Sequence, residues 1–71
     1  MERVEIVTEF IKLDSFLKLC GAASTGGQSK IMIADGEVMV DGQPCMMRGK
    51  KLYPGAVVKV GGQQFEVAGK P

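Results

Sequence analysis

The sequence contains no histidine and no tryptophan, and it has two cysteines in its 71 residues. Cys20 and Cys45 are 25 positions apart, which is not the spacing of a metal clip or of a redox pair. Without histidine, neither thiol has the neighbouring base that usually activates a catalytic cysteine. We therefore expect reduced thiols, no metal or other cofactor, and a domain that is held together by packing and is not an enzyme.

Long apolar runs are also absent. The longest uninterrupted apolar stretch spans a few residues, whereas a membrane-spanning helix needs about 20. No basic run precedes an apolar segment of the signal-peptide kind. We expect a cytoplasmic monomer without a membrane partner. A chain of this size has room for one domain, over residues 1–71, with a thin core, because small domains bury only about 60% of their unfolded surface.

The net charge of +1 is too small to indicate a nucleic-acid partner, but its distribution is uneven. Residues 1–41 hold four basic and seven acidic side chains, which gives −3, and residues 42–71 hold five basic and one acidic, which gives +4. Three of these cations, Arg48, Lys50 and Lys51, fall within four positions of a stretch without acids. This asymmetry favours a polyanionic partner.

The first half of the chain predicts one strand and two helices. Alternation with period two indicates a strand over residues 3–8. A helix is expected over 14–20, with Asp14 as its N-cap and a glycine stop at position 21. A second helix is expected over 28–35, capped by Ser24 or Thr25 and ended by the glycine at position 36.

Strand and turn signals fill the second half. Alternation over 37–40 runs into Asp41-Gly42, a pair that suits the positive backbone angles of a tight hairpin. Residues 43–51 show no clear period, so we expect a basic loop with a short return strand. The remaining expected elements are a turn at residues 53–55 and a terminal hairpin that pairs 57–60 with 64–67 across 61–63.

From Lys12 to about Val60, the order of elements and the residues at their ends resemble the S4 RNA-binding domain family. The most specific part is a Gly-x-Val-x-Val-Asp-Gly run after an apolar helix, preceded by a Leu-Asp-x-Phe-Leu helix start. Residues 25–31 resemble the second-helix opening of small free-standing bacterial members. The resemblance is carried by Lys12, Leu13, Asp14, Phe16, Leu17, Gly21, Ser24, Ile33, Gly36, Val38, Val40, Asp41, Gly42, Pro54, Gly55 and Val57.

The resemblance implies an α+β, S4-like (αL) RNA-binding fold, with two short helices packed on a small antiparallel or mixed sheet and a C-terminal β-hairpin. It also implies that the helices and the following hairpin dock onto structured RNA, ribosomal RNA among the candidates. Such RNA is recognised through its phosphates and its shape. The side chains expected to contact RNA are Lys12, Lys18, Ser24, Thr25, Lys30, Arg48, Lys50 and Lys51.

One departure concerns Gly26 and Gly27, which stand where many S4 domains carry arginines. Glycine costs about 1 kcal/mol relative to alanine inside a helix. The pair therefore either delays the helix start or lets the backbone approach a phosphate.

Simpler roles compete with these assignments. Lys59 and Lys70 are expected to do no more than keep the surface solvated, and Ser24 and Thr25 can serve as structural caps. Met46 and Met47 neighbour the basic loop, so they contact a ribose or a protein if exposed and the hairpin if buried. The alternative function is a protein interaction module, in a ribosome-associated or RNA-processing assembly, with ribosome-associated proteins as partners.

Overall fold

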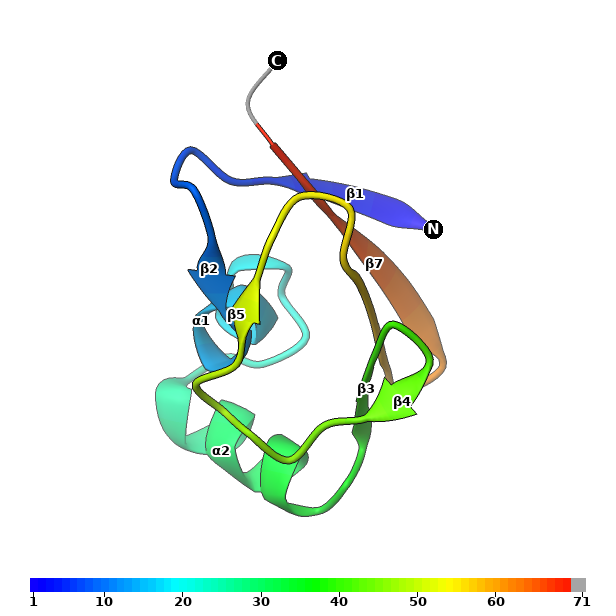
Figure 1. The fold of residues 1–71 in the computed structure, drawn as a ribbon. Coiled ribbons are helices and arrows are strands. Elements are labelled where there is room, and N and C mark those ends of the chain that lie inside the picture. Colours follow the sequence, from blue (N-terminus) through cyan, green and yellow to red (C-terminus); the bar gives the residue numbers. More distant parts are fainter. Residues whose placement is uncertain (70–71) are drawn as a thin grey trace.

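A five-stranded mixed sheet, a separate two-stranded ribbon and two helices form residues 1–69, the part of the chain that this computed structural model describes (Figure 1). Lys70, expected to be a solvating surface residue, lies outside the described residues. The elements are β1 (Glu2–Glu5), β2 (Ile11–Lys12), α1 (Leu13–Leu19), α2 (Gly26–Ala34), β3 (Val38–Val40), β4 (Gln43–Pro44), β5 (Lys51–Leu52), β6 (Val57–Val60) and β7 (Gln63–Ala68).

The large sheet has the strand order β1-β7-β6-β3-β4, with the first and last strands of the chain lying side by side. β1 runs parallel to β7, whereas all other neighbours are antiparallel. β2 pairs with β5 in the two-stranded ribbon. The expected combination of two helices, a mixed sheet and a C-terminal hairpin is confirmed.

Two tight turns connect the antiparallel hairpins. Asp41 and Gly42 have φ values of 51° and 84°, and Gly61 and Gly62 have φ values of 58° and 79°. Positive φ at both central residues is the signature of the two-residue hairpin turn that matches strand twist. The Asp41-Gly42 turn is confirmed, whereas the terminal hairpin has a two-residue turn instead of the predicted three, because Gln63 already belongs to β7.

The first strand is shorter than predicted. Alternation indicated a strand over residues 3–8, but β1 ends at Glu5. The amide of Ile6 still donates to the carbonyl of Ala68 at 2.8 Å, and this pairing lies at the end of β7. Beyond it the chain turns away, and Val7 is 86% exposed. The alternating pattern of the sequence therefore extends to residue 8, beyond the end of the pairing between β1 and β7.

The first helix starts one residue earlier than predicted, and Asp14 is not its cap. The amides of Leu13 and Asp14 donate to the carbonyls of Lys50 and Arg48, at 2.9 and 3.1 Å. The Asp14 carboxylate instead accepts from the adjacent amide of Ser15 at 2.7 Å, inside the first turn. A distant loop supplies the helix start with acceptors, so the local cap assignment was wrong.

The second helix begins at Gly26, two residues earlier than predicted, which excludes the first of the two alternatives for the glycine pair, a delayed helix start. Thr25 is the N-cap, and its Oγ1 accepts from the amide of Gln28 at 3.0 Å. The Gln28 side chain in turn accepts from the amide of Ser24 at 2.7 Å. This reciprocal pair of hydrogen bonds fixes the first turn, where Gly26 and Gly27 lie.

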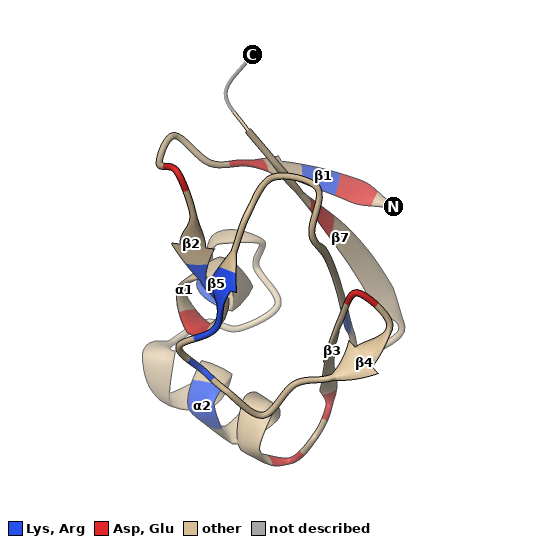
Figure 2. Ribbon diagram, in the orientation of Figure 1, with Lys and Arg blue, Asp and Glu red and all other residues tan. Residues whose placement is uncertain are grey.

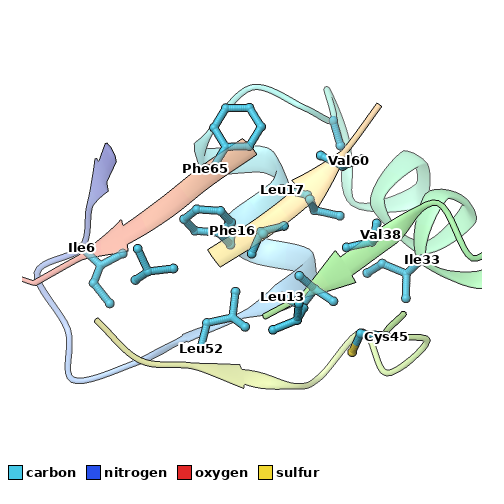
Figure 3. Close-up of a cluster of buried hydrophobic side chains, with 14 residues drawn as sticks. Ile6, Leu13, Phe16, Leu17, Ile33, Val38, Cys45, Leu52, Val60 and Phe65 are labelled. Atoms are coloured by element: carbon cyan, nitrogen blue, oxygen red, sulfur yellow. The ribbon is translucent and has the colours of Figure 1, made fainter. Parts of the chain in front are cut away.

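Helix α1 provides the centre of the core. Leu13, Phe16 and Leu17 are fully buried, and the rings of Phe16 and Phe65 meet edge to face with centroids 6.5 Å apart. Figure 3 shows these side chains between the helices and the sheet, together with Leu52 from the ribbon. The buried apolar set is Ile6, Leu13, Phe16, Leu17, Ala23, Ile33, Val38, Val40, Cys45, Leu52, Val58, Val60, Phe65, Val67 and Ala68.

Both helices are short, with seven residues in α1 and nine in α2. They pack against each other as well as against the sheet. Within residues 1–69, no helix has the length and apolar character needed to cross a membrane.

Two leucines on α1 allow a matched stability test. Leu17 is fully buried, whereas Leu19 is 52% exposed. We expect Leu17→Ala to lower the free energy of unfolding by about 2–5 kcal/mol, through lost burial and a cavity. Leu19→Ala removes the same atoms from the same helix and should cost much less. Urea unfolding followed by circular dichroism measures both, and equal losses would contradict the described core.

Candidate nucleic-acid interface

The basic loop is attached to the start of α1 by its own backbone. The carbonyls of Arg48 and Lys50 accept from the first two helical amides, so both cationic residues lie beside the N-terminus of α1. Lys12 immediately precedes the helix and is paired with Lys51 in the antiparallel ribbon. Three basic residues from positions 48–51 and the distant Lys12 therefore lie near one helix end.

Helix α2 adds a fifth basic residue through a buried serine. Ser29 is fully buried, and its hydroxyl donates to the carbonyl of Asp14 at 3.1 Å and to that of Thr25 at 3.3 Å. This contact holds α2 against the first turn of α1, and Lys30 is the next residue along α2. We call Lys12, Lys30, Arg48, Lys50 and Lys51 the basic cluster.

All five side chains of the basic cluster are exposed. In the described part of the chain, the single ion pair joins Arg3 and Glu66 at 3.7 Å, on β1 and β7. Asp14 is the acid next to the cluster, and its carboxylate accepts from the amide of Ser15. The cations therefore remain available for an external anion.

Charge is unevenly distributed over the molecule. Figure 2 shows basic residues along β2, β5, the segment before β5 and α2, whereas β1 carries residues of both signs. Acidic residues lie on β7, at the turns between α2 and β3 and between β3 and β4, and also before β2 and in α1, near the basic residues. The acids at the turn between α2 and β3 are Asp35 and Glu37. A polyanion approaching the cluster thus meets fewer acidic than basic side chains.

Three of the residues predicted to contact RNA lie outside the cluster. Lys18 is exposed in the last turn of α1, at the opposite end from Lys12. Ser24 and Thr25 are exposed at the start of α2, where the Thr25 side chain is the helix cap. The structure thus brings together five of the eight predicted residues and leaves these three on the adjoining helix ends.

Sequence reasoning missed two aromatic residues beside the cluster. Continuing the β2·β5 register by one pair places Phe10 opposite Tyr53, and their ring centroids are 5.9 Å apart. The Lys51 ammonium lies 4.7 Å from the centroid of the Phe10 ring. The two segments, Phe-Ile-Lys over residues 10–12 and Lys-Leu-Tyr over 51–53, are too short to show a strand period in the sequence.

Met46 and Met47 are exposed, at 67% and 68%, which answers the question that the sequence left open. Between them and β3 lies an open hollow of about 430 Å³. Cys45 also lines this hollow and is buried, and its amide donates to the carbonyl of Val38. Apolar surface is therefore present next to the basic cluster.

The cysteines do not have the environment of nucleophiles. Both are free thiols, with Cys20 half-buried and Cys45 buried. Burial raises the pKa of the Cys20 thiol above its ordinary value. Cys20 is therefore protonated at neutral pH, and a protonated thiol is a poor nucleophile.

Fold and site together define a small α+β domain whose exposed cations converge on a helix end, a class of domain suited to binding polyanions. The sequence matches the S4 domain family over residues 4–68. The chain therefore belongs to the S4 domain family.

Two curated bacterial proteins of similar size resemble the chain. It is 42% identical over 59 residues to the probable ribosome maturation protein RlbA of Bacillus subtilis (strain 168), covering 83% of each chain. It is 37% identical over 57 residues to the putative RNA-binding protein YbcJ of Escherichia coli (strain K12), covering 80% of this chain and 81% of that protein.

Solved structures agree with this assignment. The solution structure of YbcJ from Escherichia coli, described as having an alpha-L motif involved in RNA binding, aligns with a TM-score of 0.73 and 32% identity over 96% of this chain and 87% of that one. The 30S ribosomal protein S4e of Thermoplasma acidophilum aligns with a TM-score of 0.64 and 17% identity, over 83% of this chain and 31% of that one, which shows a shared fold.

The cap of α2 gives a matched test of local structure. Thr25→Ala removes the hydroxyl that accepts from the Gln28 amide and should lower the free energy of unfolding by about 1 kcal/mol. Ser24→Ala removes a neighbouring hydroxyl that does not cap the helix, so its effect should stay within about 0.5 kcal/mol. Thermal unfolding of both variants measures the difference, and a larger loss from Ser24→Ala would contradict the assigned cap.

Proposed function

We propose that this domain, over residues 1–71, binds structured RNA without catalysis, with the basic cluster as its main contact surface. The observation that carries the proposal is the convergence of five exposed cations on the start of α1, held there by backbone hydrogen bonds and by Ser29. Fixed backbone positions let several lysines and an arginine meet phosphates at the same time. The affinity then comes mainly from counterion release.

Structured RNA fits this surface better than a duplex that is recognised through its base sequence. The grooves of an RNA double helix expose phosphates and hydroxyls more readily than base edges, so shape and charge decide recognition. The cluster combines four lysines with one arginine. Lysine acts as a point charge toward phosphate, whereas specific reading of bases relies on bidentate side chains.

The names of two relatives support an RNA partner and point to one class of RNA. One is named as a putative RNA-binding protein and another as a probable ribosome maturation protein. We therefore propose ribosomal RNA as the partner and the cytoplasm as the location. Ribosome-associated proteins are the secondary partners of this proposal.

The three outlying residues have a supporting role in the proposal. Lys18, Ser24 and Thr25 lie along the exposed ends of α1 and α2, where they can contact a backbone that extends beyond the cluster. Gly26 and Gly27 present first-turn amides next to them, and such amides favour phosphate. Loss of any one of these contacts should weaken binding less than loss of a cluster lysine.

A protein partner is the second candidate, favoured by the exposed Met46 and Met47. Methionine is common at binding surfaces that adapt to their partners. The two side chains line the hollow next to β3. Binding of this kind would depend little on salt, which separates it from phosphate contact.

A charge reversal tests the RNA proposal. Lys50→Glu keeps the backbone carbonyl that holds α1 and removes one phosphate contact, so we expect weaker binding to a structured RNA hairpin. The slope of log affinity against log salt should also fall in magnitude by about 0.7 to 0.9. Lys59→Glu is the control, because Lys59 is exposed on β6, outside the cluster.

Fluorescence anisotropy with a labelled hairpin, a single strand and duplex DNA, across a salt series, measures these effects. Tightest binding to the hairpin, with a loss specific to Lys50→Glu, is the expected result. Equal losses in both variants would mean that net charge, and not the cluster, governs binding. A folded protein that ignores every RNA would contradict the proposed function and favour the protein partner.

A further inference from the structure

We infer that the outer face of the β2·β5 ribbon is a stacking site for an unpaired nucleobase, adjacent to the structured RNA held by the basic cluster. This inference rests on the proposed function and deepens it. It assigns a role to Phe10 and Tyr53, and it predicts that the preferred RNA is a hairpin with a single-stranded flank, not a blunt one.

Strand alternation creates this face. Ile11 and Leu52 form one cross-strand pair, and their side chains point inward, with Leu52 fully buried. The residues on either side of this pair point to the opposite face. That outer face carries two cross-strand pairs, Phe10 with Tyr53 and Lys12 with Lys51.

The two aromatic rings support each other. Their centroids are 5.9 Å apart and their planes are inclined at 48°. Phe10 is half-buried, and the Lys51 ammonium lies over its ring at 4.7 Å. Tyr53 stays 50% exposed, so part of its ring is left for another group. A side chain held in place on one side and open on the other loses little entropy when a base stacks on it.

Charge identifies the occupant of this exposed aromatic surface. Lys12 and Lys51 belong to both the aromatic face and the basic cluster, and they carry no carboxylate partner among residues 1–69. Aromatic rings beside a basic track are the arrangement by which proteins hold single-stranded nucleic acid, with bases on the rings and phosphates on the cations. An apolar protein segment would leave the two lysines without a partner.

The position of the aromatic pair next to the basic cluster indicates which part of the RNA binds to it. The aromatic pair lies two residue pairs beyond Lys12 and Lys51, as the next pair on the same face, on the side away from α1. A strand that leaves the double-helical region at the cluster would meet Tyr53 next. Stacking does not depend on base identity, so the site recognises an unpaired nucleotide and not a sequence.

Replacing the ring tests the inference without removing the apolar cover over Phe10. Tyr53→Leu keeps an apolar side chain of comparable size but has no aromatic face, whereas Tyr53→Phe keeps the ring. The assay is anisotropy of a labelled RNA hairpin with and without a short single-stranded flank, for the parent and both variants. Thermal unfolding of each variant confirms that the fold is retained.

The parent and Tyr53→Phe should bind the flanked hairpin more tightly than the blunt one, by roughly 5- to 150-fold, the range for one base stacked on an aromatic ring. Tyr53→Leu should bind both hairpins alike. A flank preference that survives in Tyr53→Leu, or its absence in the parent, would overturn the stacking site while blunt-hairpin binding still upholds the proposed function. Failure of the parent to bind either RNA would overturn both.

Intrinsic fluorescence provides an independent readout, because the chain has one tyrosine and no tryptophan. The intrinsic fluorescence therefore comes from Tyr53 and reports on the environment of this side chain. Stacking of a base on Tyr53 should quench its fluorescence when an unlabelled flanked hairpin is added, and a blunt hairpin should quench it less. Equal quenching by both hairpins would overturn the assignment.

Discussion

The candidate site depends on two backbone hydrogen bonds, from the amides of Leu13 and Asp14 to the carbonyls of Lys50 and Arg48. The first amides of a helix have no partner within the helix, and here a distant loop supplies the acceptors. Each such bond contributes about 0.5–1.5 kcal/mol net. Their larger consequence is positional, because they bring two cationic residues to the helix start.

This arrangement places like charges near the positive end of a helix dipole, which is unfavourable without a bound anion. The cost is limited because all five side chains of the basic cluster are exposed. In water, two unit charges 4 Å apart repel each other by about 1 kcal/mol. Bound phosphates would reverse the sign of these interactions, so the same cluster that weakly opposes folding favours binding.

The core and the surface are coupled through alternate residues of the same segments. Leu13 is fully buried, yet its amide holds Lys50. Leu52 is also fully buried, and the residues on either side of it, Lys51 and Tyr53, lie on the outer face. A loss of packing under the ribbon would therefore displace both the cations and the aromatic pair.

Local signals in the sequence were enough to predict most of the fold. Turn chemistry identified the Asp41-Gly42 hairpin, and cap and stop residues identified both helices. The error at the start of α1 was caused by pairing between distant segments. Asp14 had the residue type of a cap, but the loop around Arg48 already supplies an acceptor to its own amide.

The candidate site was predictable in part. Charge spacing pointed to Arg48, Lys50 and Lys51, because these cations are close in sequence. The aromatic pair was not recognised, since Phe10 and Tyr53 are brought together by strands of two residues, too short for any period. Only the register of the ribbon reveals that they share a face with the lysines.

Mapping of backbone amide chemical shifts during titration with an RNA hairpin tests most directly whether the docked loop and the start of α1 form the binding surface. The largest changes should fall on residues 12–14, 30 and 48–53. The edge formed by β1 and β7, which includes Glu2 and Glu66, should change little. Changes centred on that edge, with residues 12–14 and 48–53 unaffected, would contradict the proposed interface.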